Sequence, residues 1–71
     1  MTNILKISEA ASIGLHSMIY LARRKDQLVS VKDIAQEFDI SANHLSKVLQ
    51  RLVKSGLLVS IKGAKGGFKL T

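Results

Sequence analysis

The fold is decided by residues 41–56, SANHLSKVLQRLVKSG. Apolar residues recur there at i, i+3, i+4, i+7 and i+8, which places them on one face of a helix. They are Leu45, Val48, Leu49, Leu52 and Val53. Ser41 is typical of the residue that caps a helix start, and Gly56 suits the left-handed residue that follows a helix end. The pattern predicts a helix over about 41–55.

The opposite face of this helix is polar and basic. At about 100° per residue it presents Asn43, Lys47, Gln50 and Lys54, flanked by His44, Ser46 and Arg51. Residues 41–71 contain six of the eleven Lys and Arg residues and no Asp or Glu, whereas residues 1–40 contain five of each sign. The formal net charge of +6 therefore lies on residues 41–71, which indicates a surface that meets a polyanion.

The segments around this helix complete a recognisable order of elements. Downstream, residues 57–61 and 68–71 are expected to be strands joined by a glycine-rich turn, and we call this hairpin (57–71) the wing. Upstream, one helix is expected over about 8–24, starting at Ser8 after a short lead-in, and another over about 31–38, capped by Ser30. Residues 28–29 indicate a short strand. The order predicts a single, mainly α domain, a winged helix-turn-helix with three helices and a two- or three-stranded antiparallel hairpin.

The expected first helix has one continuous apolar face, and it also carries apolar residues on its other sides. The face contains Ala11, Gly14, Leu15, Met18, Leu21 and Ala22. A helix that is apolar on more than one side requires two partners, and the rest of this chain supplies one. Gly14, which costs about 1 kcal/mol in a helix interior, is expected to permit a close helix crossing.

Composition excludes several classes of function. The 71 residues make one domain, and the absence of cysteine excludes disulfides and thiolate ligands within the chain. His44 has no second histidine or carboxylate at ligand spacing, so no metal site is expected. No nucleophile, base and orienting group can be assembled, so an enzyme is not expected. No apolar run approaches the ~18 residues of a membrane span and no signal pattern opens the chain, so the expected compartment is the cytoplasm.

Two groups of residues are candidates for contacts with DNA. The major groove admits one α-helix whose outer side chains reach base edges. The helical candidates are Ser41, Asn43, His44, Ser46, Lys47, Gln50 and Arg51. The alternative is a solvated helix face, which normally interleaves acids with bases. In the wing, Lys62 and Lys65 lie among glycines, where a basic side chain could enter the minor groove; a plain tight turn with solvated lysines is the alternative.

Several runs of residues resemble the DNA-binding domain of the Rrf-type (Rrf2) family of bacterial winged-helix transcription regulators. These runs are KIS at 6–8, GLHSMIYLA at 14–22, VKDIA at 31–35, ISANHLSKVL at 40–49, and KGAKGGFKL at 62–70. The resemblance covers nearly the whole chain, and the combination of the 40–49 run with the Gly-Gly-aromatic wing is specific to the family.

The resemblance implies a homodimer that binds a palindromic operator in double-stranded DNA, with helix 41–55 in the major groove and the wing in the minor groove. It places Ser41, Asn43, Ser46 and Lys47 where the family contacts bases or phosphates, and Lys62 where a basic wing residue, usually Arg, enters the minor groove. Two departures stand out. The family usually has Tyr at the position of Ile13, and its iron–sulfur regulator has an acidic residue at the position of Ser46.

Family members continue past the wing into a long dimerisation helix and, in the sensors, a three-cysteine cluster-binding loop, neither of which is in this chain. We therefore expect the chain to be the DNA-binding part of a longer regulator that dimerises through helix 8–24 and that missing helix. No cofactor is expected in this chain, and an iron–sulfur cluster in a longer parent protein stays open. The expected function is transcription regulation, with repression favoured. The alternative is a winged-helix module that binds an acidic protein partner.

Overall fold

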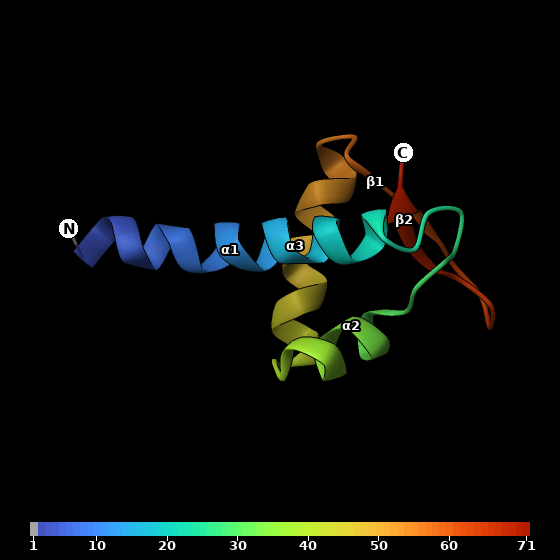
Figure 1. Cartoon of the computed structure of the whole chain (residues 1–71), viewed down its shortest axis with the longest axis horizontal. Helices are drawn as coiled ribbons and strands as arrows, with labels where there is room; N and C mark the ends of the chain where they lie inside the picture. The colour runs from blue at the N-terminus through green and yellow to red at the C-terminus, as the bar shows by residue number, and fades with distance from the viewer. Residues whose placement is uncertain (1) are drawn as a thin grey trace.

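The structure, a computed structural model, describes the backbone of residues 2–71 and the side chains of residues 9–71. Three helices, α1 (Thr2–Ala22), α2 (Val31–Phe38) and α3 (Ala42–Lys54), precede strands β1 (Leu58–Ile61) and β2 (Gly67–Leu70). The long α1 crosses α3, with α2 below the crossing and the hairpin beside the C-terminal end of α1 (Figure 1). The predicted winged helix-turn-helix, three helices and an antiparallel hairpin, is confirmed.

The first helix is longer at its start, and shorter at its end, than expected. It begins at Thr2 instead of about Ser8, so the predicted lead-in is wrong for residues 2–7; Met1 lies outside the described residues. The chain has no proline, and its first glycine is Gly14, so nothing in the sequence interrupts the helix there. The helix ends at Ala22 instead of about Arg24, where the chain turns through Asp26, whose φ is +69°.

The buried line of α1 also differs from the predicted face. Gly14, Ser17 and Leu21 are buried, whereas Leu15 remains 59% exposed. Ser17 is polar, but its Oγ donates a 2.7 Å hydrogen bond to the Ile13 carbonyl, so its burial leaves no unsatisfied group. The spacing of apolar residues could not predict that Ser17 is buried, because Ser17 is polar and its burial depends on this hydrogen bond.

Gly14 lies at the crossing of α1 and α3, but the crossing does not require glycine. A Cβ built at Gly14 would lie 3.6 Å from Val48 Cγ1 and 3.7 Å from Leu52 Cδ1, which is ordinary van der Waals contact. Gly14→Ala should therefore stabilise the chain by about 1 kcal/mol, through helix propensity. Thermal unfolding followed by circular dichroism should show a melting temperature about 4–8 °C higher. A lower melting temperature would mean that the crossing is too close for a methyl group.

The caps of α2 and α3 confirm the predicted serines. Ser30 Oγ accepts a hydrogen bond from the Asp33 N–H at 3.1 Å, and Ser41 Oγ accepts one from the His44 N–H at 3.3 Å. Between the helices, Asp39 adopts a left-handed conformation with φ +54°, and the Ile40 N–H donates to the Ala35 carbonyl. This tight turn fixes the direction in which α3 leaves α2.

The core lies where the three helices meet the hairpin. Its buried side chains are Leu21, Val29, Ile34, Ala35, Leu45, Leu49, Leu58 and Phe68. β1 and β2 pair antiparallel, with Ser60 opposite Phe68. The expected strand at 28–29 is a single bridge, in which Val29 exchanges two backbone hydrogen bonds with Phe68. Phe68 thus anchors the wing to the helices.

Candidate nucleic-acid interface

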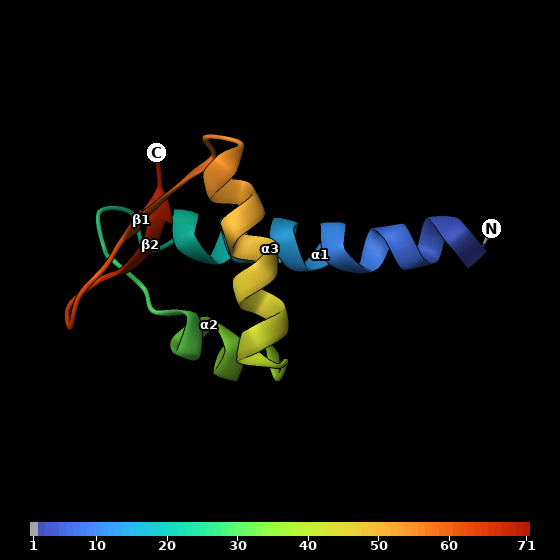
Figure 2. The same ribbon diagram turned by 180° about the vertical axis from the view of Figure 1, so that it is seen from behind.

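The outer face of α3 is exposed and basic, as its periodicity predicts. Leu45, Val48 and Leu49 are buried, and Leu52 and Val53 are half-buried against the core. The opposite side presents exposed Asn43, His44, Lys47, Gln50, Arg51 and Lys54. α3 lies in front of α1 in the view of Figure 2, so α1 supports α3 from behind and leaves the outer face uncovered.

Part of this face forms a shallow depression of about 320 Å³. It is lined by Ser46, Lys47, Gln50, Arg51 and Lys54. Lys54 was not among the expected DNA contacts, although its position seven residues after Lys47 places it on the same face. The two hydrogen-bonding side chains Ser46 and Gln50 thus lie among three cations, an arrangement that suits contact with a charged backbone and with base edges.

The first turn of α3 presents three further expected contacts. Ser41 and Asn43 are exposed, and so is His44. Ser41 Oγ already accepts the capping hydrogen bond from His44. Its hydroxyl hydrogen remains available to an acceptor such as a phosphate oxygen.

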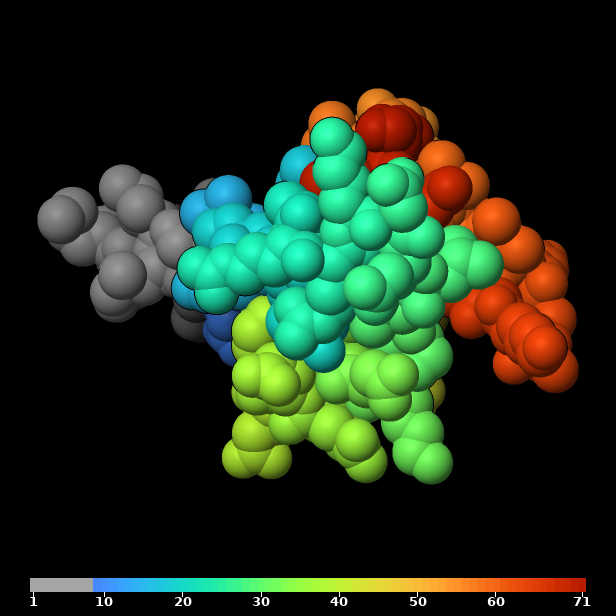
Figure 3. All heavy atoms as spheres, turned by 45° about the vertical axis from the view of Figure 1, so that its right-hand side comes forward, coloured from blue at the N-terminus to red at the C-terminus, as the bar shows by residue number. Residues whose placement is uncertain are grey.

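The tip of the wing presents the other two expected contacts. Lys62 and Lys65 are both exposed. The space-filling view shows the tip projecting from the body of the molecule (Figure 3). The two lysines at the tip are therefore accessible to a partner.

The glycines of the wing have structural roles of their own. Gly63 adopts φ +119°, and its carbonyl accepts a 3.0 Å hydrogen bond from the Gly66 N–H, which closes the turn. A Cβ at Gly66 would collide with the Ile61 carbonyl oxygen, and one at Gly67 would lie 2.7 Å from the Val29 carbonyl oxygen. Close packing against the backbones of Ile61 and Val29 is therefore sufficient to require glycine at these two positions.

The histidines make different contacts. His16 Nδ1 donates to the Ser12 carbonyl at 2.7 Å, and its ring packs edge-on against Phe38, with ring centroids 6.2 Å apart. His44 is exposed at the start of α3. Across the described side chains, His, Asp and Glu form no group of three that could hold a metal ion. Within residues 2–71, no helix is long and apolar enough to cross a membrane.

An apolar groove of about 370 Å³ runs between α1 and α3. It is lined by Ala10, Ala11, Gly14, Leu15, Met18, Val48, Arg51 and Leu52. Leu15 is 59% exposed, and Ile19, one turn further along α1, is 43% exposed. Leu15 and Ile19 thus belong to an apolar surface of α1 that lies outside the core.

Comparison with known proteins identifies the family that this fold and surface belong to. The family model for Rrf2, described as an iron-dependent transcriptional regulator, matches residues 7–71. The chain belongs to the Rrf2 family. The predicted resemblance is confirmed, and the Rrf2 relatives are transcriptional regulators and not enzymes.

Two curated Rrf2 relatives show how much of a regulator the chain spans. It is 40% identical over 65 residues to a putative HTH-type transcriptional regulator, BadM, of Rhodopseudomonas palustris, covering 92% of this chain and 42% of BadM. It is 42% identical over 67 residues to NsrR of Halalkalibacterium halodurans, covering 93% of this chain and 46% of NsrR. The chain therefore spans about half the length of these relatives.

Solved Rrf2 structures share the fold. CymR of B. subtilis, the global cysteine regulator, superposes with a TM-score of 0.81 at 37% identity, over 86% of this chain and 48% of CymR. IscR of T. potens superposes with a TM-score of 0.77 at 34% identity, over 86% of this chain and 45% of IscR. Both superpositions support the winged-helix arrangement of α3 and the hairpin.

Proposed function

We propose that this chain is the DNA-binding part of a transcriptional regulator, with α3 in the major groove and the wing in the minor groove. The observation that carries the proposal is the outer face of α3, which is exposed, rich in cations and without a carboxylate from residue 41 onward. Cations near phosphates release condensed counterions, and polar side chains between them pair with base edges. Membership of a family of transcriptional regulators supports this function.

The residues divide into two roles in this proposal. Asn43, Ser46, Lys47 and Gln50 face the bases, because their side chains carry the donors and acceptors that base edges match. Arg51, Lys54 and the wing lysines contact phosphates or the minor groove. Ser41 and His44, at the start of α3, contact the backbone of the DNA.

Lys47→Ala should both weaken binding and relax sequence preference. A side chain that reads a base contributes about 1–3 kcal/mol of discrimination, so binding to the preferred site should fall about tenfold while other sequences lose less. Fluorescence anisotropy with a selected duplex and a scrambled duplex measures both affinities. Lys25→Ala, an exposed lysine outside residues 41–71, is the matched control and should leave both unchanged.

Lys62→Ala in the wing separates the two roles. It should weaken binding to all sequences, or chiefly to sites with A/T-rich flanks. If Lys47→Ala, like Lys62→Ala, weakened binding to the selected duplex and to the scrambled duplex by the same factor, the assignment of Lys47 to a base would be wrong.

The regulator acts as a homodimer in this proposal, as a repressor on a palindromic operator in the cytoplasm. The exposed apolar side of α1, with Leu15 and Ile19, and the groove beside it supply a surface for a helix that follows the wing in longer members of the family. Covering that surface removes apolar area from water, which stabilises association. Symmetric half-sites then follow from the twofold symmetry of the dimer.

Iron–sulfur chemistry does not fit the residues of this chain. Clusters are held mainly by cysteine thiolates, and the chain has no cysteine. This chain therefore supplies no thiolate ligand to a cluster, and the proposed function is derived without one.

A further inference from the structure

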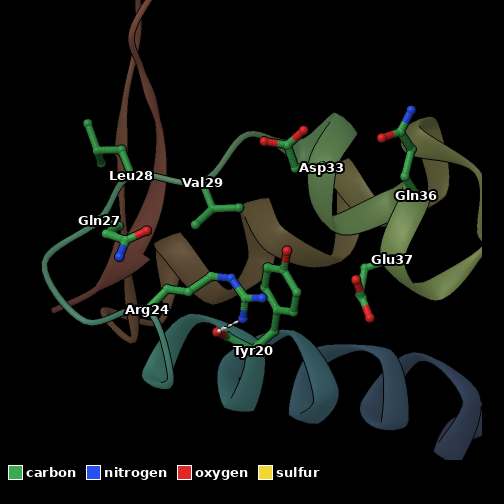
Figure 4. Close-up of a pocket in the computed structure, with 8 residues that line it drawn as sticks. All are labelled: Tyr20, Arg24, Gln27, Leu28, Val29, Asp33, Gln36 and Glu37. Carbon is green, nitrogen blue, oxygen red and sulfur yellow. Dashed lines mark hydrogen bonds between the residues drawn. The ribbon is translucent and has the colours of Figure 1, made fainter.

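A second cleft, of about 420 Å³, opens where the end of α1, the turn after it and α2 meet. It is lined by Tyr20, Arg24, Gln27, Leu28, Val29, Asp33, Gln36 and Glu37. α3 passes behind this cleft in the close-up (Figure 4). The cleft therefore opens on a different side of the molecule from the outer face of α3, and the proposed DNA contacts do not use its residues.

Arg24 is fixed in place on one side of the cleft. Its guanidinium carbon lies 3.6 Å from the centroid of the Tyr20 ring, and its Nη1 donates a 3.1 Å hydrogen bond to the Tyr20 carbonyl. Tyr20 is itself held edge-on against Phe38, with ring centroids 5.7 Å apart. The stack uses the flat face of the guanidinium, so its remaining N–H groups can donate to a carboxylate at little cost in side-chain entropy.

Two carboxylates from α2 face the same cleft. Asp33 and Glu37 are four residues apart and so lie on one face of the helix. Among the eight lining residues, the hydrogen bond drawn in Figure 4 joins Arg24 to Tyr20, so neither carboxylate is paired with Arg24. The Tyr20 hydroxyl points from the ring toward α2, with the Arg24 guanidinium on one side and the Glu37 carboxylate on the other, whereas the Asp33 carboxylate points away from Glu37 (Figure 4).

We propose that this cleft binds a small zwitterion, whose carboxylate pairs with Arg24 and whose ammonium group lies beside the Glu37 carboxylate and the Tyr20 hydroxyl. A guanidinium fork matches a carboxylate, and a carboxylate with a phenolic oxygen nearby can accept hydrogen bonds from an ammonium group. A ligand with one charge would satisfy one side of the cleft and leave the other unpaired. The inference goes beyond the proposed function and does not depend on DNA binding.

The test is a titration of the ¹⁵N-labelled chain, without DNA, with a series of ω-amino acids of increasing length: glycine, β-alanine, γ-aminobutyrate, δ-aminovalerate and ε-aminocaproate. One length should shift the Arg24 Nε–H and the backbone amides of residues 33–37 saturably, with a Kd on the order of 1 mM for so small a ligand. Butyrate and butylammonium carry one charge each and should bind at least about tenfold more weakly. Equal binding by either of them, or no saturable shift with any zwitterion, overturns the proposal.

Glu37→Gln should weaken binding of the best zwitterion about tenfold, because it removes one charged acceptor and changes little else at an exposed position. Glu9→Gln, the same change at an exposed position of α1 outside the cleft, is the matched control and should bind as the unchanged chain does. Unaltered binding by Glu37→Gln also overturns the proposal. Because the readout contains no DNA, failure here leaves the proposed function untouched.

Discussion

Raising the salt concentration from ~50 to ~200 mM should weaken the DNA binding of each protomer about a hundredfold. Arg51, Lys54, Lys62 and Lys65 are the cations assigned to phosphates or the minor groove, so about four phosphates can be neutralised by each protomer. Each neutralised phosphate contributes about −0.9 to the slope of log affinity against log salt, which gives a slope of about −3.6 for each protomer. Anisotropy titrations at several salt concentrations measure the slope directly.

Two single-site variants test where this slope comes from. Lys65→Gln removes one cation from the wing and should make the slope shallower by about 0.9. Lys25→Gln removes an equally exposed cation outside residues 41–71 and should leave the slope unchanged. If both variants changed the slope by the same amount, binding would depend on the net charge of the chain and not on the surface of α3 and the wing.

Gly66→Ala should destabilise the chain by about 3 kcal/mol, at the upper end of the usual cost of overpacking. The added Cβ would meet the backbone of Ile61 and Lys62, which cannot rotate away as a side chain can. Chemical denaturation followed by circular dichroism measures the loss of unfolding free energy. Because β2 also holds Phe68 in the core, the damage should extend beyond the wing.

Gly56→Ala is the comparison that isolates this collision. Gly56 has φ +82°, but a Cβ there would meet nothing within 4 Å. The substitution should cost only about 1 kcal/mol, from backbone strain in the left-handed region. If Gly66→Ala were no worse than Gly56→Ala, the close approach of Gly66 to Ile61 would not exist in solution.

The sequence was sufficient to predict those features of the fold that depend on residues close together in the chain. The apolar stripe of α3 fixed which side chains are buried, and the serine caps at Ser30 and Ser41 make the expected hydrogen bonds. Gly56 takes the left-handed conformation expected after a helix. Each of these features depends on residues within four positions of one another, so the sequence displays it directly.

Features that depend on distant segments could not be predicted. Arg24 was expected to be the last residue of the first helix, but α1 ends at Ala22 and Arg24 stacks on Tyr20 beside α2. The sequence predicts that Gly66 and Gly67 lie in a turn, but not that a Cβ at these positions would meet the backbones of Ile61 and Val29. The long start of α1 was missed because Ser8 resembles a cap, and a serine inside a helix costs too little to stop it.

The candidate site was predictable as a set of positions but not as a shape. Lys47 and Gln50 were expected on the outer face of α3, and they are exposed there. The depression that joins them to Lys54 emerges only from the packed structure. Which of these side chains contact bases is a proposal that binding experiments decide.

The most direct measurement is selection of bound sites from a random pool of duplex DNA, carried out in parallel with the unchanged chain and with Lys47→Ala. We expect an enriched motif with symmetric half-sites about one helical turn apart, and a change of preferred base in each half-site when Lys47 is removed. Salt-sensitive binding with no enriched motif, or the same motif from both proteins, would contradict the claim that α3 reads DNA sequence through this face.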